Sequence, residues 1–154
     1  MKQLVNSREN HYLAVLLSEN NDEQVLEKLA DTLYGQDYVT EQYKGAIKRR
    51  EKEFPTGLPT GEICVAIPHT DPQYVNAPAI CLGILEKPVE FHVMGMENET
   101  VDVQIVFMLA IKKKEDQLGL LQKLIEVCQN QEILKVIMQG NEEIINKVMM
   151  ELIK

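Results

Sequence analysis

The sequence of 154 residues has no tryptophan, few aromatic side chains and few cysteines. The shortage of aromatic rings argues against a platform for stacking nucleic-acid bases. The cysteines are odd in number, far apart and placed within apolar runs, which predicts reduced core residues and neither a disulfide framework nor a metal site: Cys64, Cys81 and Cys128. No apolar run approaches the ~18–20 residues of a membrane span, and the N-terminus lacks the apolar segment of a signal peptide. We therefore expect a cytoplasmic protein.

The sequence also lacks an excess of positive charge, since its formal net charge is −8 at pH 7. This charge disfavours nucleic acids and anionic membranes as partners. It suits a protein partner with a basic surface, although solubility alone would account for it. The sequence contains no P-loop, no glycine-rich nucleotide fingerprint, no zincin motif, no nucleophilic serine elbow and no kinase signature. We therefore expect neither a nucleotide cofactor nor a metal ion.

The pattern of apolar residues predicts a single α/β domain over residues 1–154, with a loose lead-in at residues 1–10. Strands are expected at 12–17, 63–67, 79–85, 89–91 and 101–111, and helices at about 21–35, 40–53, 115–129, 131–139 and 141–152. Asn21, Thr40 and Asn141 are expected to cap the starts of three of these helices. The connections that follow residue 69 are short, so part of the sheet should be antiparallel. The expected fold class is an α/β sandwich in which α-helices flank a mixed parallel and antiparallel β-sheet.

One of the predicted strands leads directly into a histidine. The run from Ile63 to Ile67 is apolar and partly β-branched, as in a buried strand. Pro68 has no backbone N–H and should end the pairing of this strand. His69 then stands where the strand reaches the surface, on a backbone that can hold one ring nitrogen in a fixed direction. A histidine without a task would also fit at such a strand end.

Helical spacing separates the two arginines of the second predicted helix. Its apolar stripe consists of Tyr43, Ala46, Ile47 and, at its end, Phe54. At ~3.6 residues per turn, Arg50 falls inside this stripe and Arg49 falls outside it. A guanidinium held against the protein needs an anionic or carbonyl partner. Arg50 therefore lines an anion site, takes part in an internal ion pair, or extends its head group to water.

Helical spacing also predicts which side chains are buried in the helix that is expected to begin at about residue 115. We expect its buried face to carry Leu118, Leu121, Leu124, Ile125 and Cys128, and Gln117 falls on that face. Gln117 also lies in the first turn, where backbone N–H groups lack helical partners and anions bind well. Its amide can donate to a phosphoryl oxygen or to an imidazole nitrogen, or it can simply bond to the backbone. A histidine with an anion clamp and no nucleotide site indicates an imidazole that itself carries a phosphoryl group.

Two segments resemble a known family. Residues 50–57, Arg-Glu-Lys-Glu-Phe-Pro-Thr-Gly, and residues 65–69, Val-Ala-Ile-Pro-His, are similar to the enzyme IIA domains of the bacterial phosphoenolpyruvate-dependent sugar phosphotransferase system, in the fructose/mannitol superfamily. The Phe-Pro-Thr-Gly form and the pair Gln117-Leu118 look most like the galactitol-type branch. The resemblance extends from about residue 12 to 150, and it implies a mixed sheet flanked by helices.

The resemblance also implies roles for individual residues. His69 matches the histidine that accepts a phosphoryl group from HPr, through Nε2, and passes it to a cysteine of a cognate enzyme IIB. Arg50 matches the arginine that lines the phosphoryl site. Gln117 stands where many members carry a second histidine, and Thr70 stands where a smaller residue, often glycine, is common. The hydroxyl of Thr70 would bond the phosphoryl group or merely tolerate the turn. The resemblance implies a phosphotransferase without cofactors that associates peripherally with a membrane enzyme IIC.

Two other functions remain open from the sequence. A regulatory module of the same fold would control transport or transcription and pass nothing to an enzyme IIB. An interaction domain would lack phosphotransfer altogether. The transported sugar or polyol is not encoded in the chain, since the membrane component selects it, and galactitol rests on resemblance to that branch. His11 and His92 lie outside the motifs and are expected to have no catalytic role.

Overall fold

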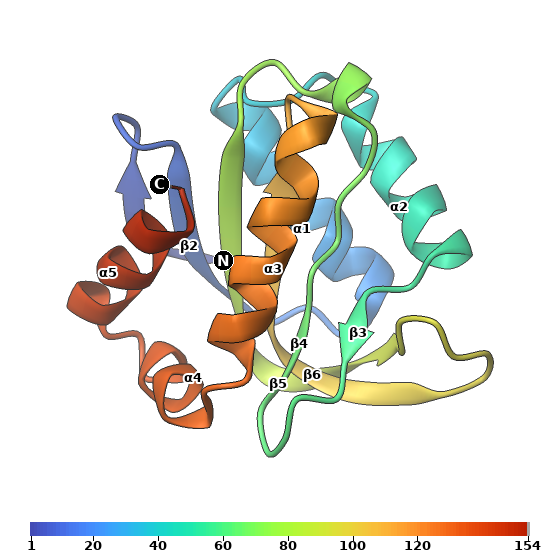
Figure 1. Cartoon of the computed structure of the whole chain (residues 1–154), viewed down its shortest axis with the longest axis vertical. Coiled ribbons are helices and arrows are strands. Elements are labelled where there is room, and N and C mark those ends of the chain that lie inside the picture. The colour runs from blue at the N-terminus through green and yellow to red at the C-terminus, as the bar shows by residue number, and fades with distance from the viewer. Residues whose placement is uncertain (154) are drawn as a thin grey trace.

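The computed structural model of the chain describes residues 1–153, and its centre is a six-stranded β-sheet with helices on both faces (Figure 1). The strands are β1 Lys2–Ser7, β2 Tyr12–Leu17, β3 Gly57–Leu58, β4 Cys64–Ala66, β5 Ala79–His92 and β6 Thr100–Ala110. Their order across the sheet is β1-β2-β5-β6-β4-β3. The pairs β2/β5 and β4/β6 are parallel, and the other three pairs are antiparallel. The predicted mixed sheet is therefore confirmed.

The helices are divided between the two faces of the sheet. Their bounds are α1 Asp22–Gly35, α2 Tyr43–Glu53, α3 Gln117–Cys128, α4 Gln131–Met138 and α5 Glu142–Leu152, with short 3-10 turns η1 at Pro72–Tyr74 and η2 at Lys114–Asp116. Residues of α1 and α2 share one apolar cluster with one face of the strands. Residues of α3, α4 and α5 share a second cluster with the other face. In Figure 1, α3 crosses in front of the sheet and α1 lies behind it.

Asparagine side chains cap three of the helices, as the sequence indicates for two of them. Asn21 Oδ1 accepts the backbone N–H of Gln24 at 2.9 Å at the start of α1. At the start of α5, Asn141 Oδ1 accepts the backbone N–H of Ile144 at 3.0 Å. At the start of α4, Asn130 Oδ1 accepts the backbone N–H of Ile133 at 3.2 Å. Each bond satisfies a backbone donor that has no partner within the helix. These caps explain why the predicted starts of α1 and α5 are confirmed.

Several predicted boundaries are wrong where strand pairing decides the structure. Residues 2–7, within the expected loose lead-in, form β1 and pair with β2. The expected strands 79–85 and 89–91 are one strand, β5, with a register shift between Ile84 and Val89 that accommodates the proline of this segment. The expected loop between the second helix and β4 contains the short strand β3. Each of these outcomes depends on a partner strand that is distant in the sequence.

The two helices nearest the predicted site also differ from expectation. Helix α2 begins at Tyr43, and Thr40 contributes only its backbone carbonyl, which accepts the Tyr43 N–H at 3.1 Å. In α3, Leu118 is 67% exposed and Ile125 is 37% exposed, although both were expected on the buried face. Leucines stand on two sides of this helix, and the side that meets the sheet is centred on Leu124 and Cys128.

The cysteines are buried and unpaired, as predicted. Burial raises the pKa of Cys81 and of Cys128 to about 12, so both remain protonated thiols at neutral pH. Among residues 1–153, the helices are too short or too polar for any of them to cross a membrane.

Tyr43 joins α2 to the end of β6, because its buried hydroxyl donates to the Leu109 carbonyl oxygen at 2.7 Å. We predict that Tyr43→Phe lowers the free energy of unfolding by about 1–2 kcal/mol, since the carbonyl loses its buried donor. Urea denaturation measures this change. Tyr34→Phe is the control, because Tyr34 is 49% exposed. Equal stability of the two variants would contradict the importance of this bond.

Candidate functional site

His69 is attached to the carboxyl end of β6. After β4 ends at Ala66, the Pro68 carbonyl oxygen accepts the Leu109 N–H at 3.0 Å, and His69 pairs with Leu109 in a parallel bridge. The strand therefore ends before Pro68, as expected, and a single isolated bridge follows it, because proline lacks an N–H but keeps a carbonyl that can accept. This bridge ties the backbone of His69 to β6.

A backbone carbonyl also fixes the imidazole. His69 Nδ1 lies 2.8 Å from the Ile67 carbonyl oxygen. A carbonyl oxygen can only accept, so Nδ1 carries the proton and Nε2 carries the lone pair. Burial lowers the pKa of His69, the hydrogen bond to Ile67 opposes this shift, and the positive charge of Arg50 lowers the pKa further. The imidazole is therefore neutral near pH 7, with Nε2 able to act as a nucleophile.

Arg50 lies on the face of α2 that meets the protein. It is half-buried and Arg49 is exposed, which confirms the difference expected from helical spacing. The guanidinium carbon of Arg50 stacks 4.4 Å from the ring centroid of Phe54. Phe54 itself is 52% exposed, so its expected place in the buried stripe is wrong. Within residues 1–153, no carboxylate forms an ion pair with Arg50, so its N–H donors are available to an anion.

Thr70 follows His69 directly, whereas Gln117 is distant from it in the sequence, and no hydrogen bond within residues 1–153 joins either side chain to the imidazole. Gln117 is the first residue of α3 and is half-buried, in helical phase with Leu124 and Cys128. Asp116, at the N-cap position, makes no side-chain cap, and the Gln117 N–H donates to the Lys114 carbonyl oxygen of η2. Thr70 is buried directly after His69. The recorded hydrogen bonds of residues 1–153 include none from the side chains of Gln117 and Thr70.

The sequence reasoning missed a buried carboxylate beside Arg50. Glu51 is 6% exposed, and its two oxygens accept the backbone N–H and the hydroxyl of Thr56, each at 2.8 Å. Burial raises the pKa of Glu51 to about 7, and the two bonds from Thr56 oppose that rise. Helical spacing contained the signal, because Glu51 stands four residues after the buried Ile47.

Gly57, the residue after Thr56, must be a glycine. A Cβ atom on Gly57 would lie 2.6 Å from the His92 carbonyl oxygen, which is closer than real Cβ atoms approach backbone. The Met94 N–H donates to the Gly57 carbonyl at 2.9 Å, so the loop after α2 lies against the far end of β5. This close approach gives the Thr-Gly pair of the sequence motif a structural reason.

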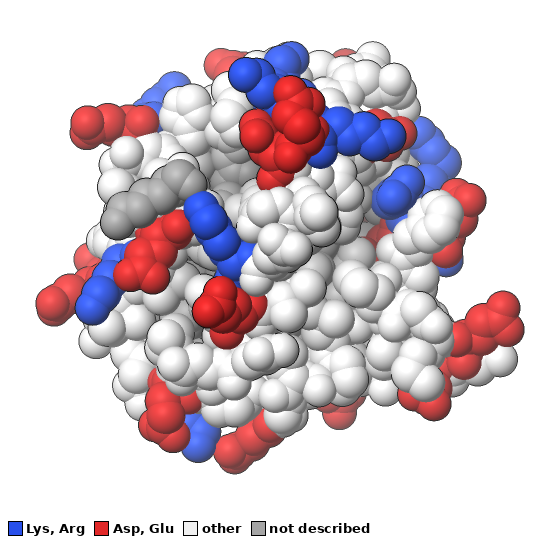
Figure 2. Space-filling view, in the orientation of Figure 1, with Lys and Arg blue, Asp and Glu red and all other residues white. Residues whose placement is uncertain are grey.

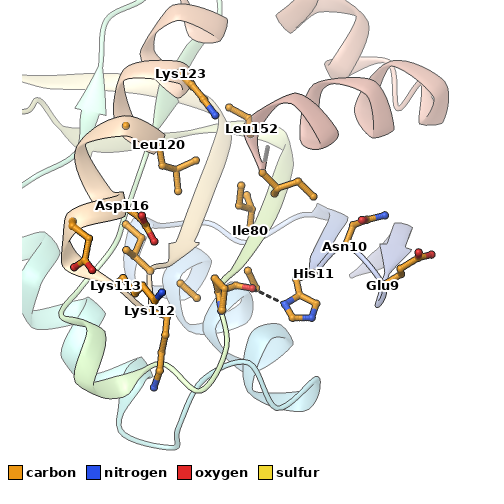
Figure 3. Close-up of a pocket in the computed structure, with 17 residues that line it drawn as sticks. Glu9, Asn10, His11, Ile80, Lys112, Lys113, Asp116, Leu120, Lys123 and Leu152 are labelled. Carbon is orange, nitrogen blue, oxygen red and sulfur yellow. Dashed lines mark hydrogen bonds between the residues drawn. The ribbon is translucent and has the colours of Figure 1, made fainter.

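A surface hollow of about 770 Å³ is separate from the site residues (Figure 3). Its lining includes His11, Ile80, Lys113, Asp116 and Leu120, and it includes neither His69 nor Arg50 nor Gln117. His11 lies at one side of this hollow, with Nδ1 2.9 Å from the Pro78 carbonyl oxygen. Lysines and carboxylates alternate around the rim, so the hollow has no charge preference that would identify a ligand.

The face of the molecule that carries α3 is charged mainly near its edges. Figure 2 shows side chains of both signs there, while the middle of this face, below the upper end of α3, is largely uncharged. Two exposed apolar side chains belong to residues next to site residues: Phe54 stacks on Arg50, and Leu118 follows Gln117 in the chain. Exposed apolar side chains of this size are common in interfaces between proteins.

Comparison with known proteins identifies relatives over most of the chain. The family model described as "Phosphoenolpyruvate-dependent sugar phosphotransferase system, EIIA 2" matches residues 9–151. The transcriptional regulator ManR of Bacillus subtilis (strain 168) is 36% identical over 93 residues, which are 60% of this chain and 13% of that longer protein. The galactitol-specific EIIA component of Escherichia coli (strain K12) is 28% identical over 114 residues, covering 74% of this chain and 75% of that protein.

A solved structure shares the fold. The complex of enzyme IIAMTL and phosphorylated enzyme IIBMTL from Escherichia coli aligns with a TM-score of 0.72 at 14% identity, covering 95% of this chain and 98% of that chain. At this identity the similarity supports the arrangement of strands and helices and no more.

The electrostatic link between Arg50 and His69 can be tested by NMR titration. We predict that His69 in the wild-type protein titrates below the ordinary histidine pKa of ~6.5. Arg50→Met should raise this pKa, because removing a nearby positive charge favours the imidazolium. Arg49→Met is the matched control and should leave it unchanged, since Arg49 is exposed. An equal response to both substitutions would exclude a specific effect of Arg50.

Proposed function

The chain belongs to the EIIA 2 family of the phosphoenolpyruvate-dependent sugar phosphotransferase system, and from this premise we propose that it is a phosphocarrier that accepts a phosphoryl group on His69 and passes it to an enzyme IIB. The observation that carries the proposal is the imidazole of His69. The hydrogen bond from Nδ1 to the Ile67 carbonyl leaves the lone pair on Nε2, and the nearby Arg50 has no carboxylate partner within residues 1–153.

In the first step, Nε2 of His69 attacks the phosphorus of the phosphohistidine of HPr. The N–P bond of the donor breaks as the new bond forms, and its electron pair returns to the donor imidazole. The His69 ring becomes positive, and its Nδ1–H then makes a charge-assisted hydrogen bond to the Ile67 carbonyl. In-line transfer of this kind depends mainly on positioning and on stabilising the charge of the phosphoryl oxygens.

In the second step, the thiolate of an enzyme IIB cysteine attacks the same phosphorus, and Nε2 leaves with its lone pair. The similar structure of enzyme IIAMTL from Escherichia coli, in complex with phosphorylated enzyme IIBMTL, supports a partner of this class. Phe54, which stacks on Arg50, and Leu118, which follows Gln117, are exposed and would contact the partner protein. The complex would associate peripherally with a membrane enzyme IIC that selects the sugar.

The remaining site residues have supporting roles in this proposal. Arg50 would bind two phosphoryl oxygens through its planar guanidinium. Gln117, beside the uncapped start of α3, would donate an uncharged hydrogen bond that does not change with pH. Thr70 would offer its hydroxyl from the position after His69. The similarity to a galactitol-specific EIIA component supports a polyol of that type as the transported solute.

The first test is labelling with phosphoenolpyruvate, enzyme I and HPr. We predict that wild-type protein is labelled and that His69→Ala is not, because Nε2 of His69 is the acceptor atom. The control is His92→Ala, which removes an exposed histidine of β5 and should be labelled like the wild type. Undiminished labelling of His69→Ala would contradict the proposal.

A regulatory module is the second candidate, and the ManR similarity favours it. A regulator would also accept a phosphoryl group but would not deliver it to an enzyme IIB. We predict that phosphorylated protein loses its label within seconds when a purified galactitol-type enzyme IIB is added, and that a Cys→Ser variant of that enzyme IIB leaves the label in place. A label that persists with the intact enzyme IIB would favour the regulator.

A further inference from the structure

We propose that Glu51 is a positioning residue for His69, acting through Thr56 and Ile67. The inference rests on the proposed function of His69 and extends it to residues that do not touch the phosphoryl group. Glu51 is next to Arg50 in α2, and His69 follows β4 in a different part of the chain. The connection between them would set the position of Nε2 relative to the guanidinium.

The first part of the connection joins α2 to the loop that follows it. Both oxygens of the Glu51 carboxylate are bonded to Thr56, one to its N–H and one to its hydroxyl. Thr56 is itself 4% exposed, so water does not compete for these bonds. The pair fixes Thr56 in position immediately before β3 begins at Gly57.

The second part of the connection runs from Thr56 to the imidazole. The Thr56 carbonyl oxygen accepts the Ile67 N–H at 3.3 Å, extending the antiparallel pairing of β3 with β4. The Ile67 carbonyl oxygen in turn accepts Nδ1–H of His69 at 2.8 Å. A continuous series of hydrogen bonds thus links the residue beside Arg50 to the ring that would attack phosphorus.

The buried carboxyl group of Glu51 needs an explanation that stability alone does not provide. Within residues 1–153 it forms no ion pair, and burying a carboxylate without one is costly. Both of its oxygens accept from Thr56. A leucine at this position would remove both acceptors and leave the N–H and the hydroxyl of Thr56 without these bonds.

A displacement of Thr56 would move Ile67, and with it the carbonyl oxygen that accepts Nδ1–H of His69. If that carbonyl moves, Nδ1 loses its fixed acceptor and the proton can occupy either ring nitrogen. The tautomer with the proton on Nε2 has no lone pair directed at phosphorus. Small misplacements of reacting groups lower transfer rates steeply, so the effect should appear in the chemical step and not in partner binding.

The test compares Glu51→Leu and Thr56→Val with two controls. Thr56→Ser keeps the N–H and the hydroxyl, so it should restore wild-type behaviour. Thr60→Val removes a comparable bond in the same loop, from Thr60 Oγ1 to the Ile63 carbonyl at 2.8 Å, that is not part of the series. Each variant is measured by 15N NMR of the His69 ring and by kinetics of phosphoryl transfer from phospho-HPr.

The wild type should show one tautomer, with the proton on Nδ1. Glu51→Leu and Thr56→Val should each show a mixture of tautomers and a kcat lowered about tenfold, with KM for phospho-HPr unchanged. Thr56→Ser and Thr60→Val should match the wild type in both measurements. If Glu51→Leu does not fold, Thr56→Val decides the same question, since it retains the carboxylate.

Wild-type tautomer and kcat in Glu51→Leu and Thr56→Val would overturn the inference, as would equal losses in Thr60→Val. The NMR measurement needs no phosphoryl donor. A wild-type protein that HPr does not label would therefore reject the proposed function while the tautomer still tests the positioning role.

Discussion

The hydrogen bond between His69 Nδ1 and the Ile67 carbonyl determines the chemistry available to this chain. It assigns the proton to one ring nitrogen and leaves the other with a lone pair. The bond spans only two residues, so a local backbone conformation has to be held accurately. The sheet provides this, because Leu109 of β6 pairs with the chain on both sides of the Pro68–His69 peptide bond.

The helices on the two faces of the sheet carry the other proposed site residues. Helix α2 brings Arg50 and Glu51 from one face, and α3 begins with Gln117 on the other face. The guanidinium rests against Phe54 and is not neutralised by a carboxylate of the described residues. Glu51, the one buried carboxylate of residues 1–153, directs both oxygens to Thr56. In the proposed function, the positive charge of Arg50 would bind the incoming anion.

Local patterns predicted much of this arrangement. Helical spacing separated Arg50 from Arg49, and asparagine caps marked the starts of α1 and α5, because both signals lie within a few residues. The pairing of β1, the union of residues 79–92 into one strand and the continued pairing at His69 depend on distant partners. The burial of Glu51 was missed because carboxylates are rarely buried, and because its partner Thr56 lies beyond the end of the helix, where helical spacing gives no information.

The buried thiols have a consequence for any exchange with a cysteine-bearing partner. A sulfur must be a thiolate to attack phosphorus or a disulfide. Burial raises the pKa of Cys81 and Cys128 to about 12, so neither can divert a phosphoryl group from His69 or form a mixed disulfide with the partner while the fold is intact. Thiol-specific reagents applied to a mixture of the two proteins would therefore leave these two sulfurs unmodified.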